Sequence, residues 1–121
     1  MGKILIVDDA RLMRNIIKNN LPDNGPLEII EAQNGEEAVA MYKDHSPDLV
    51  TMDITMENIN GLDAAKEILA YDQDAKIIMV TAIVQEKILM ECVNIGVSDY
   101  IVKPFSKERI SSSISKALQK A

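Results

Sequence analysis

Several side chains that can carry chemistry stand at the ends of short apolar segments of the chain. Asp8 and Asp9 follow one such segment, Asp53 follows another, and Thr81 and Lys103 close two more. Carboxylates held close together repel one another, so such a group either raises its pKa values or binds a cation. Mg²⁺ is the expected cation, because it accepts one or two carboxylates and keeps waters that phosphoryl oxygens can replace. With an ammonium and a hydroxyl opposite, the set predicts an aspartyl-phosphate site.

Each of these residues also has a simpler interpretation when it is taken alone. An aspartate that closes a strand is often only the N-cap of the next helix. Thr81 suits a strand as a β-branched residue, and most lysines, such as Lys103, are solvated surface charges. The site hypothesis therefore depends on the combination and on the elements that position it.

Two kinds of sequence pattern alternate along the chain. Apolar runs rich in β-branched residues predict strands at Lys3–Val7, Leu27–Ala32, Leu49–Met52, Lys76–Val80 and Val97–Val102. Such nearly continuous hydrophobicity is typical of strands covered on both faces. Between the runs, apolar residues recur with helical spacing. That spacing predicts a first helix around Leu12–Asn20 and further helices at Gly35–His45, Gly61–Tyr71, Gln85–Ile95 and Ser106–Lys120.

This alternation predicts an α/β fold, a (βα)5 doubly wound, flavodoxin-like sheet of five parallel strands in the order 2-1-3-4-5. Ligands of such sheets bind beyond the carboxyl ends of the strands, where the strand order reverses. Strands one and three are neighbours in this order, so Asp8, Asp9 and Asp53 are expected to converge there. No linker or repeat remains, and residues 1–121 are expected to form one domain.

The first helix is expected to pack through one apolar arc and to expose a basic one. At ~100° per residue, the packing arc holds Leu12, Met13, Ile16, Ile17 and Asn20. The opposite arc, interpreted as a solvated face, holds Arg11, Arg14 and Lys18.

The fourth helix carries more apolar surface than one packed stripe needs. The stripe expected to face the sheet comprises Val84, Ile88, Cys92 and Ile95. Met90 and Val93 lie off this stripe, and grouped exposed apolar residues beside Tyr100 predict a partner-binding face.

Composition bounds the function further. The chain has 121 residues with 47% apolar content, a net charge of −6 and a pI of about 4.7. This acidic balance argues against nucleic-acid binding, which needs a clustered positive surface. Cys92 is the only cysteine, so no internal disulfide can form. No apolar run approaches the ~18 residues of a membrane span, and we expect a cytoplasmic monomer without membrane contact.

Four segments in order, ILIVDDARLMR, VTMDITMENINGLDA, IIMVTA and DYIVKPF, resemble the hallmark segments of CheY-like response-regulator receiver domains. The resemblance runs from Lys3 to the end of the chain. Any one segment is a weak signal, but the ordered set is highly specific.

The resemblance implies a role for each site residue. Asp53 is expected to accept a phosphoryl group from a histidine kinase, with Thr81 and Lys103 in contact with the phosphoryl oxygens. The expected Mg²⁺ ligands are Asp9, Asp53 and the backbone carbonyl of Thr55, with Asp8 acting mainly through water. Tyr100 matches the aromatic switch position, and the Lys103–Pro104 bond is expected to be cis.

The implied function is phosphorelay signalling, in a stand-alone chemotaxis or motility regulator that is no enzyme beyond its own phosphorylation and dephosphorylation. Its partners would be the kinase, a motility-motor or adaptor protein bound through the fourth helix, fifth strand and fifth helix, and a phosphatase. A phosphoryl group on Asp53 would draw in the Thr81 hydroxyl, leaving room that Tyr100 fills.

One residue departs from the family pattern. Glu57 stands where a proline is usual, four residues after Asp53, which affects loop rigidity, Mg²⁺ affinity and phosphoryl lifetime. In the family the lifetime depends on positions occupied here by Thr55 and Ile83. An apolar Ile83 could obstruct the attacking water, which favours slow self-dephosphorylation.

Three other functions are known for sheets of this kind or for chains that contain one. A kinase or phosphohydrolase on the same sheet would need a glycine-rich nucleotide loop, or a second acid where Thr55 stands and a cap. A flavodoxin-like electron carrier would need a phosphate-binding loop where Asp8 and Asp9 repel phosphate. A fragment of a larger regulator with a DNA-binding domain stays open.

Overall fold

The computed structural model describes residues 2–23, 25–55 and 60–119. Within them, five parallel strands form one sheet in the order β2-β1-β3-β4-β5, as predicted. The strands are β1 (Gly2–Val7), β2 (Leu27–Ala32), β3 (Leu49–Met52), β4 (Ile77–Thr81) and β5 (Asp99–Val102). The helices are α1 (Arg11–Asn19), α2 (Gly35–His45), α3 (Gly61–Tyr71), α4 (Glu86–Ile95) and α5 (Lys107–Gln119).

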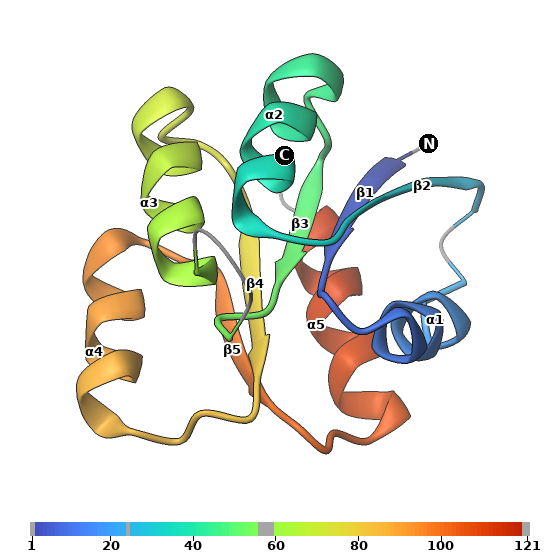
Figure 1. Ribbon diagram of the computed structural model, residues 1–121. Helices are drawn as coiled ribbons and strands as arrows, with labels where there is room; N and C mark the ends of the chain where they lie inside the picture. Colours follow the sequence, from blue (N-terminus) through green and yellow to red (C-terminus); the bar gives the residue numbers. More distant parts are fainter. Residues whose placement is uncertain (1, 24, 56–59, 120–121) are drawn as a thin grey trace.

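The helices cover the two faces of the sheet unequally (Figure 1). On one face, α2, α3 and α4 pack through residues that include Tyr42, Ile68 and Cys92. On the other face, α1 and α5 pack through Ile17 and Ile110, among others. Because both faces are covered, the residues of β3 and β4 are buried throughout, which explains why these strands are apolar except for Thr51 and Thr81.

The strand register brings the carboxyl ends together. Val7 of β1 lies opposite both Ala32 of β2 and Met52 of β3. Met52 in turn lies opposite Met79 of β4. The residues that follow these strands therefore share one edge of the sheet, which is where the sequence predicted the site.

Capping residues explain several helix limits. Asn34 and Asn60 accept hydrogen bonds from the third residue beyond them and cap α2 and α3. Gly96 adopts the left-handed conformation after α4 (φ 96°), as predicted for a C-cap. The Val97 N–H then donates to the Cys92 carbonyl. This bond keeps Val97 in the helix cap, so β5 starts at Asp99 rather than at the predicted Val97.

Three residues of the predicted helix faces are misplaced by the sequence interpretation. Leu12 and Val84 are about three-quarters exposed, although both were expected to pack. Leu12 lies in the first turn of α1. Val84 precedes α4, so there the predicted helical spacing was extended past the start of the helix. Arg14 was expected on a solvated face and is instead 9% exposed, because it forms polar contacts described below.

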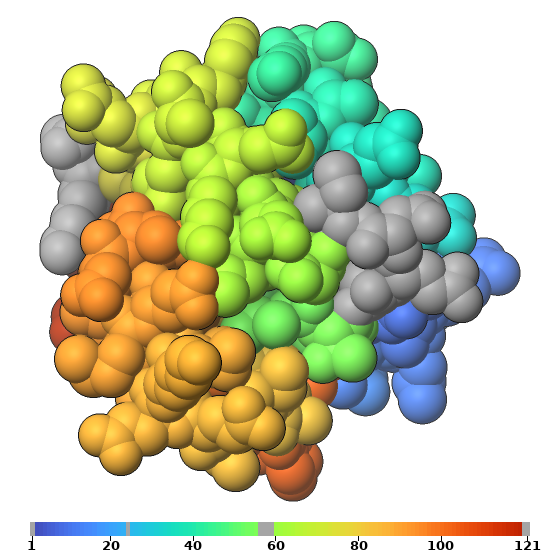
Figure 2. All heavy atoms as spheres, turned by 60° about the vertical axis from the view of Figure 1, so that its left-hand side comes forward, coloured from blue at the N-terminus to red at the C-terminus, as the bar shows by residue number. Residues whose placement is uncertain are grey.

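The surface over α3 and α4 faces the viewer in Figure 2. Met90 and Val93 of α4 are more than half exposed, as the sequence predicted for the face beside β5. Cys92 of the same helix is fully buried in the core. Among the described residues, no helix has the length and apolar character needed to cross a membrane.

Candidate functional site

The backbone at the ends of β1 and β3 positions the first acidic residues. The Asp8 N–H donates to the Ala32 carbonyl and the Asp53 N–H donates to the Val7 carbonyl, each at 3.1 Å. These bonds continue the strand ladder one residue past Val7 and Met52. Both aspartates are therefore held at the sheet edge by backbone pairing, independently of what their side chains contact.

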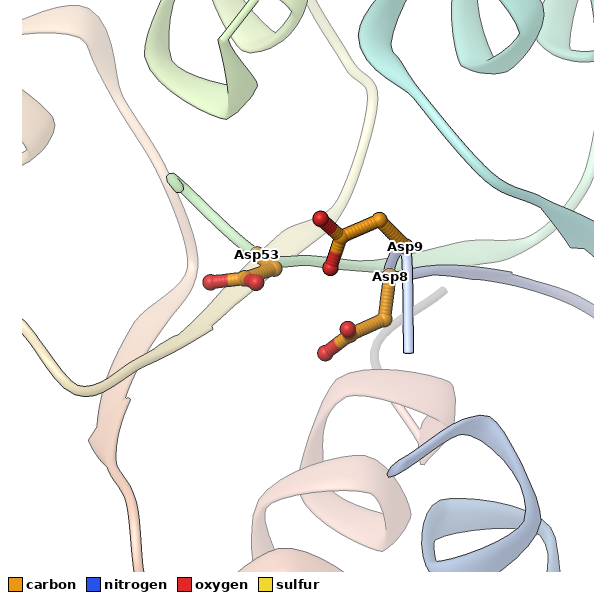
Figure 3. Close-up of side chains that lie close together, drawn as sticks. All are labelled: Asp8, Asp9 and Asp53. Atoms are coloured by element: carbon orange, nitrogen blue, oxygen red, sulfur yellow. The ribbon is translucent and has the colours of Figure 1, made fainter. Parts of the chain in front are cut away.

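Carboxylate oxygens of Asp8, Asp9 and Asp53 lie within 4.8 Å of one another. Figure 3 shows the Asp8 and Asp9 side chains leaving the end of β1 on the side of Asp53. Asp8 is 1% and Asp53 6% exposed, whereas Asp9 is exposed. We call these three residues the acidic edge. Neither Asp8 nor Asp9 caps a helix, since α1 has Ala10 at its N-cap and no side-chain cap bond.

Lys103 supplies a positive charge to the acidic edge. Its Nζ lies 2.8 Å from Asp8 Oδ2 and 3.4 Å from Asp53 Oδ2. The Lys103 N–H donates to the Thr81 carbonyl (2.9 Å), so both residues sit where β4 and β5 end. The Lys103–Pro104 bond is cis, as the resemblance implied. A half-buried lysine in contact with two carboxylates is not the solvated charge of the simpler interpretation.

The electrostatics of the acidic edge are only partly balanced. Burial raises the pKa of Asp53 most; the nearby Lys103 ammonium opposes this shift, and the Asp8 carboxylate adds to it. The backbone N–H of Thr55 donates to Asp53 Oδ1 at 3.4 Å, a long bond that compensates little. Ionisation of Asp53 is therefore less favourable than that of an exposed carboxyl, and further positive charge nearby offsets this effect.

The acidic edge fits a hard divalent cation. Carboxylate oxygens are the preferred protein ligands of Mg²⁺, and the three side chains place such oxygens within reach of a shared ion. Thr55, the other expected ligand, directly neighbours the Asp53 carboxylate. The group can therefore hold a metal ion. Glu57, the departure from the family pattern, lies outside the described residues.

Thr81 and Tyr100 meet at the backbone of one residue. The Thr81 hydroxyl, fully buried, accepts a hydrogen bond from the Ile83 N–H (3.3 Å). The Tyr100 hydroxyl donates to the Ile83 carbonyl (2.5 Å). Tyr100 is half-buried and packs against the core on the α4 side. The segment after β4 thus joins the end of β4 to the aromatic side chain of β5.

Sequence reasoning missed two residues that shape the site. A Cβ on Gly61 would lie 1.8 Å from the Asp53 backbone carbonyl oxygen, so only glycine permits this approach of α3 to β3. Arg14 donates from Nη1 to the Asp8 carbonyl at 2.7 Å. The need for glycine at position 61 depends on the approach of α3 to Asp53, and the burial of Arg14 depends on Glu31, which is distant in the chain.

The chain belongs to the response regulator receiver domain family, whose model matches residues 4–115. These domains act in two-component phosphorelays, which confirms the predicted class of protein. The chain is 49% identical to the chemotaxis protein CheY of Bacillus subtilis (strain 168) over 116 residues, covering 96% of this chain and 97% of that protein. It is 47% identical to CheY of Thermotoga maritima, covering 96% and 98%.

A solved structure agrees with the sequence relatives. The chain superimposes with a TM-score of 0.91 on a chain of the CheX-CheY-BeF3-Mg²⁺ complex from Borrelia burgdorferi. That chain is 31% identical, and the match covers 98% of this chain and 90% of the other. The flavodoxin-like fold with order 2-1-3-4-5 is thereby confirmed.

Proposed function

We propose that Asp53 accepts a phosphoryl group from a histidine kinase in a Mg²⁺-dependent reaction, and that this modification switches a partner-binding face. The observation that carries the proposal is the convergence of the acidic edge with the Lys103 ammonium against two of its carboxylates. A nucleophile, a cation-binding group and a positive counter-charge thus meet at one sheet edge.

The transfer is a displacement at phosphorus by a carboxylate oxygen of Asp53. The new P–O bond forms as the P–N bond of the phosphohistidine breaks, and its electron pair returns to the imidazole nitrogen. Positive charge near the transferred phosphoryl oxygens stabilises this step. Lys103 supplies that charge beside Asp53, and Thr81 supplies a hydroxyl. The domain catalyses its own phosphorylation and dephosphorylation only.

Asp9, Asp53 and the Thr55 backbone carbonyl are the residues assigned to hold Mg²⁺, with Asp8 acting mainly through water. When bound, Mg²⁺ supplies positive charge that neutralises the carboxylates and stabilises the phosphoryl oxygens. Because burial raises the pKa of Asp53, that charge also favours the ionised nucleophile. Lys103 alone is shared between two carboxylates and balances only one of them.

The signal leaves through the face formed by α4, β5 and α5. Thr81 and Tyr100 both bond to the backbone of Ile83. A phosphoryl group that draws the Thr81 hydroxyl toward Asp53 weakens the bond to the Ile83 N–H and changes the support of Tyr100. The exposed apolar side chains of this face, available to a partner, are Val84, Leu89, Met90, Val93 and Val102.

The biological context follows from the chemotaxis relatives. We assign the chain, over residues 1–121, to a stand-alone chemotaxis or motility regulator that works as a cytoplasmic monomer. Its partners are a histidine kinase, a motility-motor or adaptor protein and a phosphatase, without nucleic acid or membrane. Ile83 is half-buried and supports slow self-dephosphorylation by restricting the approach of water.

The test is phosphorylation by a small-molecule donor. Acetyl phosphate with Mg²⁺ should add one phosphoryl mass to the intact protein, and EDTA or Asp53→Asn should abolish the addition. Asp63→Asn, an exposed aspartate in the first turn of α3, is the matched control and should label normally. Label that persists in Asp53→Asn would contradict the assignment.

The switch has its own test. Beryllofluoride should change amide exchange over residues 82–105 of the wild type, and Thr81→Ala should reduce that change while Asp53 still becomes phosphorylated. Exchange in this segment that ignores beryllofluoride would place the output face elsewhere.

A further inference from the structure

Arg14 of α1 is a buried cation with contacts on both sides. Its Nη1 donates to the Asp8 carbonyl at 2.7 Å and its Nε donates to Glu31 Oε1 at 2.8 Å. Glu31 belongs to β2, so the guanidinium joins α1, β2 and the end of β1. Glu31 Oε2 also accepts from Lys18 Nζ at 3.0 Å. The hydrogen bonds from Lys18 and Arg14 lower the pKa of Glu31, which favours its ionised form.

The Asp8 carbonyl is the point where the chain leaves β1 for α1. The Asp8 carboxylate turns back to accept from the Ala10 N–H (2.9 Å) and from Lys103 Nζ (2.8 Å). Asp9 lies between these anchored groups, is exposed, and has its own carboxylate in the acidic edge. The direction in which Asp9 projects is therefore set by the backbone on either side of it.

A charged donor on a buried carbonyl fixes backbone geometry more strongly than a neutral one. The planar guanidinium reaches two acceptors at once, which a lysine cannot reproduce in the same geometry. Arg14, Lys18 and Glu31 also line an open polar depression of about 500 Å³ that reaches Asp9. We call the contacts of Arg14 with Glu31 and with the Asp8 carbonyl the clamp. It extends from the outer strand β2 to the acidic edge.

We propose that Arg14, anchored by Glu31, is a positioning residue that orients the Asp8–Asp9 backbone for cation binding. Arg14 touches neither the ion nor the phosphoryl group and acts through the Asp8 carbonyl. The inference rests on the proposed function, since it assigns a cause to the Mg²⁺ affinity of the acidic edge.

The test compares Arg14→Met with Lys18→Met. Methionine keeps the apolar stem of Arg14 and removes the clamp, whereas Lys18→Met removes a charge from the same Glu31 and leaves the Asp8 contact intact. We expect Arg14→Met to weaken Mg²⁺ binding by roughly tenfold, as for outer partners of metal ligands. Lys18→Met should stay within about twofold, as expected for a partly exposed ion pair. Mg²⁺ titrations followed by amide NMR at a temperature where each variant is folded give the affinities.

A metal-free readout separates this inference from the proposed function. In the absence of Mg²⁺, Arg14→Met should speed exchange of the Ala10 amide, and Lys18→Met should not. If Arg14 only fastened α1 to β2, Arg14→Met would lower stability but leave the Mg²⁺ affinity and the Ala10 amide exchange at wild-type values. That result would overturn the inference. Wild type that ignores Mg²⁺ would instead contradict the proposed function. If Arg14→Met does not fold, Glu31→Gln should show the same changes more weakly.

Discussion

Asp53 at the end of β3 and Asp99 at the start of β5 place the same functional group in opposite surroundings. Asp99 accepts from both terminal nitrogens of Arg109 (2.8 and 3.0 Å), from the Ser113 hydroxyl (2.6 Å) and from the Tyr100 N–H (2.8 Å). These donors, Arg109 above all, lower the pKa of Asp99 to about 2. Asp53 has a long backbone bond, a shared lysine and two acidic neighbours.

The difference separates a structural carboxylate from one available for chemistry. Asp99 uses its hydrogen-bonding capacity inside the protein and ties β5 to α5. Asp53 is held in place by its backbone while its side chain stays poorly compensated, so its carboxylate gains most when a ligand arrives. Functional sites commonly reduce stability in this way, and the cost here is offset by the rigid strand ladder around the acidic edge.

The largest effect should come from breaking the backbone support of Asp53. Gly61→Ala places a Cβ 1.8 Å from the Asp53 carbonyl oxygen, so α3 must move away from β3. We expect a loss of about 3 kcal/mol in the free energy of unfolding by urea titration, at the upper end for an overpacked site. Gly25→Ala, where the Cβ meets open space but φ is 92°, is the control and should cost only ~1 kcal/mol. Equal losses would mean that packing at Gly61 does not hold the strand end.

A smaller loss should follow from neutralising the structural carboxylate. Asp99→Asn removes the charge that faces Arg109, and we expect a cost of about 1–2 kcal/mol because the side chain is one-third exposed and partly screened. A double-mutant cycle with Arg109→Met should attribute most of this cost to the pair. Additive losses in the cycle would contradict the structural role of Asp99.

The pH dependence of stability in Asp99→Asn tests the direction of the Asp99 pKa shift. Because the pKa of Asp99 is depressed in the folded state, its contribution is complete above the unfolded value of about 4 and disappears as pH falls toward about 2. The wild type should lose stability over this window, and Asp99→Asn should lose less. Parallel acid profiles would show that another group controls this range.

Asp53→Asn should raise the stability of the metal-free protein, whereas Asp99→Asn should lower it. The pKa of Asp53 is raised, so ionisation costs stability as pH rises through its folded value. Removing the charge leaves Lys103 paired with Asp8. We expect the metal-free protein to gain about 1 kcal/mol at neutral pH, or a few degrees in Tm. Mg²⁺ should raise the Tm of the wild type by mass action and that of Asp53→Asn much less. A destabilised Asp53→Asn would mean that the acidic edge is not under charge strain.

The smallest expected effect concerns the buried hydroxyl of Thr51. Thr51 of β3 is fully buried, and its hydroxyl has no hydrogen-bond partner among the described residues. Thr51→Val should therefore raise the free energy of unfolding by about 0.5–1 kcal/mol. Thr81→Val, which removes the acceptor of the Ile83 N–H, should not raise it. A loss in Thr51→Val would indicate that the hydroxyl is satisfied by water.

Strand positions and the acidic edge were predictable because they depend on the local pattern of apolar and polar residues. A buried parallel strand is almost entirely apolar, so the first charged residue after it marks the edge of the sheet, as at Asp8 and Asp53. The side on which helix ends pack was less predictable. Helical spacing places Val84 on the packed stripe of α4, but the helix begins two residues later at Glu86 and the side chain points into solvent.

Arg14 and Gly61 could not be assigned from the sequence for a different reason. The environment of Arg14 depends on Glu31, 17 positions away in the chain, and an arginine on a helix usually lies in water. Gly61 is required because α3 approaches the carbonyl of Asp53, a packing distance that no local pattern encodes. Residues whose role depends on a second element need the three-dimensional structure.

The bond between Lys103 and Asp8 spans 95 positions of the chain, and this has a consequence for biosynthesis. A growing polypeptide has all three acids of the acidic edge once β3 has been made, but it has no ammonium there until β5 follows. Closing so long a loop is slow and depends on the whole sheet being assembled. If Asp53 is the phosphoryl acceptor proposed above, a chain that ends before β5 lacks the Lys103 ammonium beside it and is expected to be phosphorylated poorly.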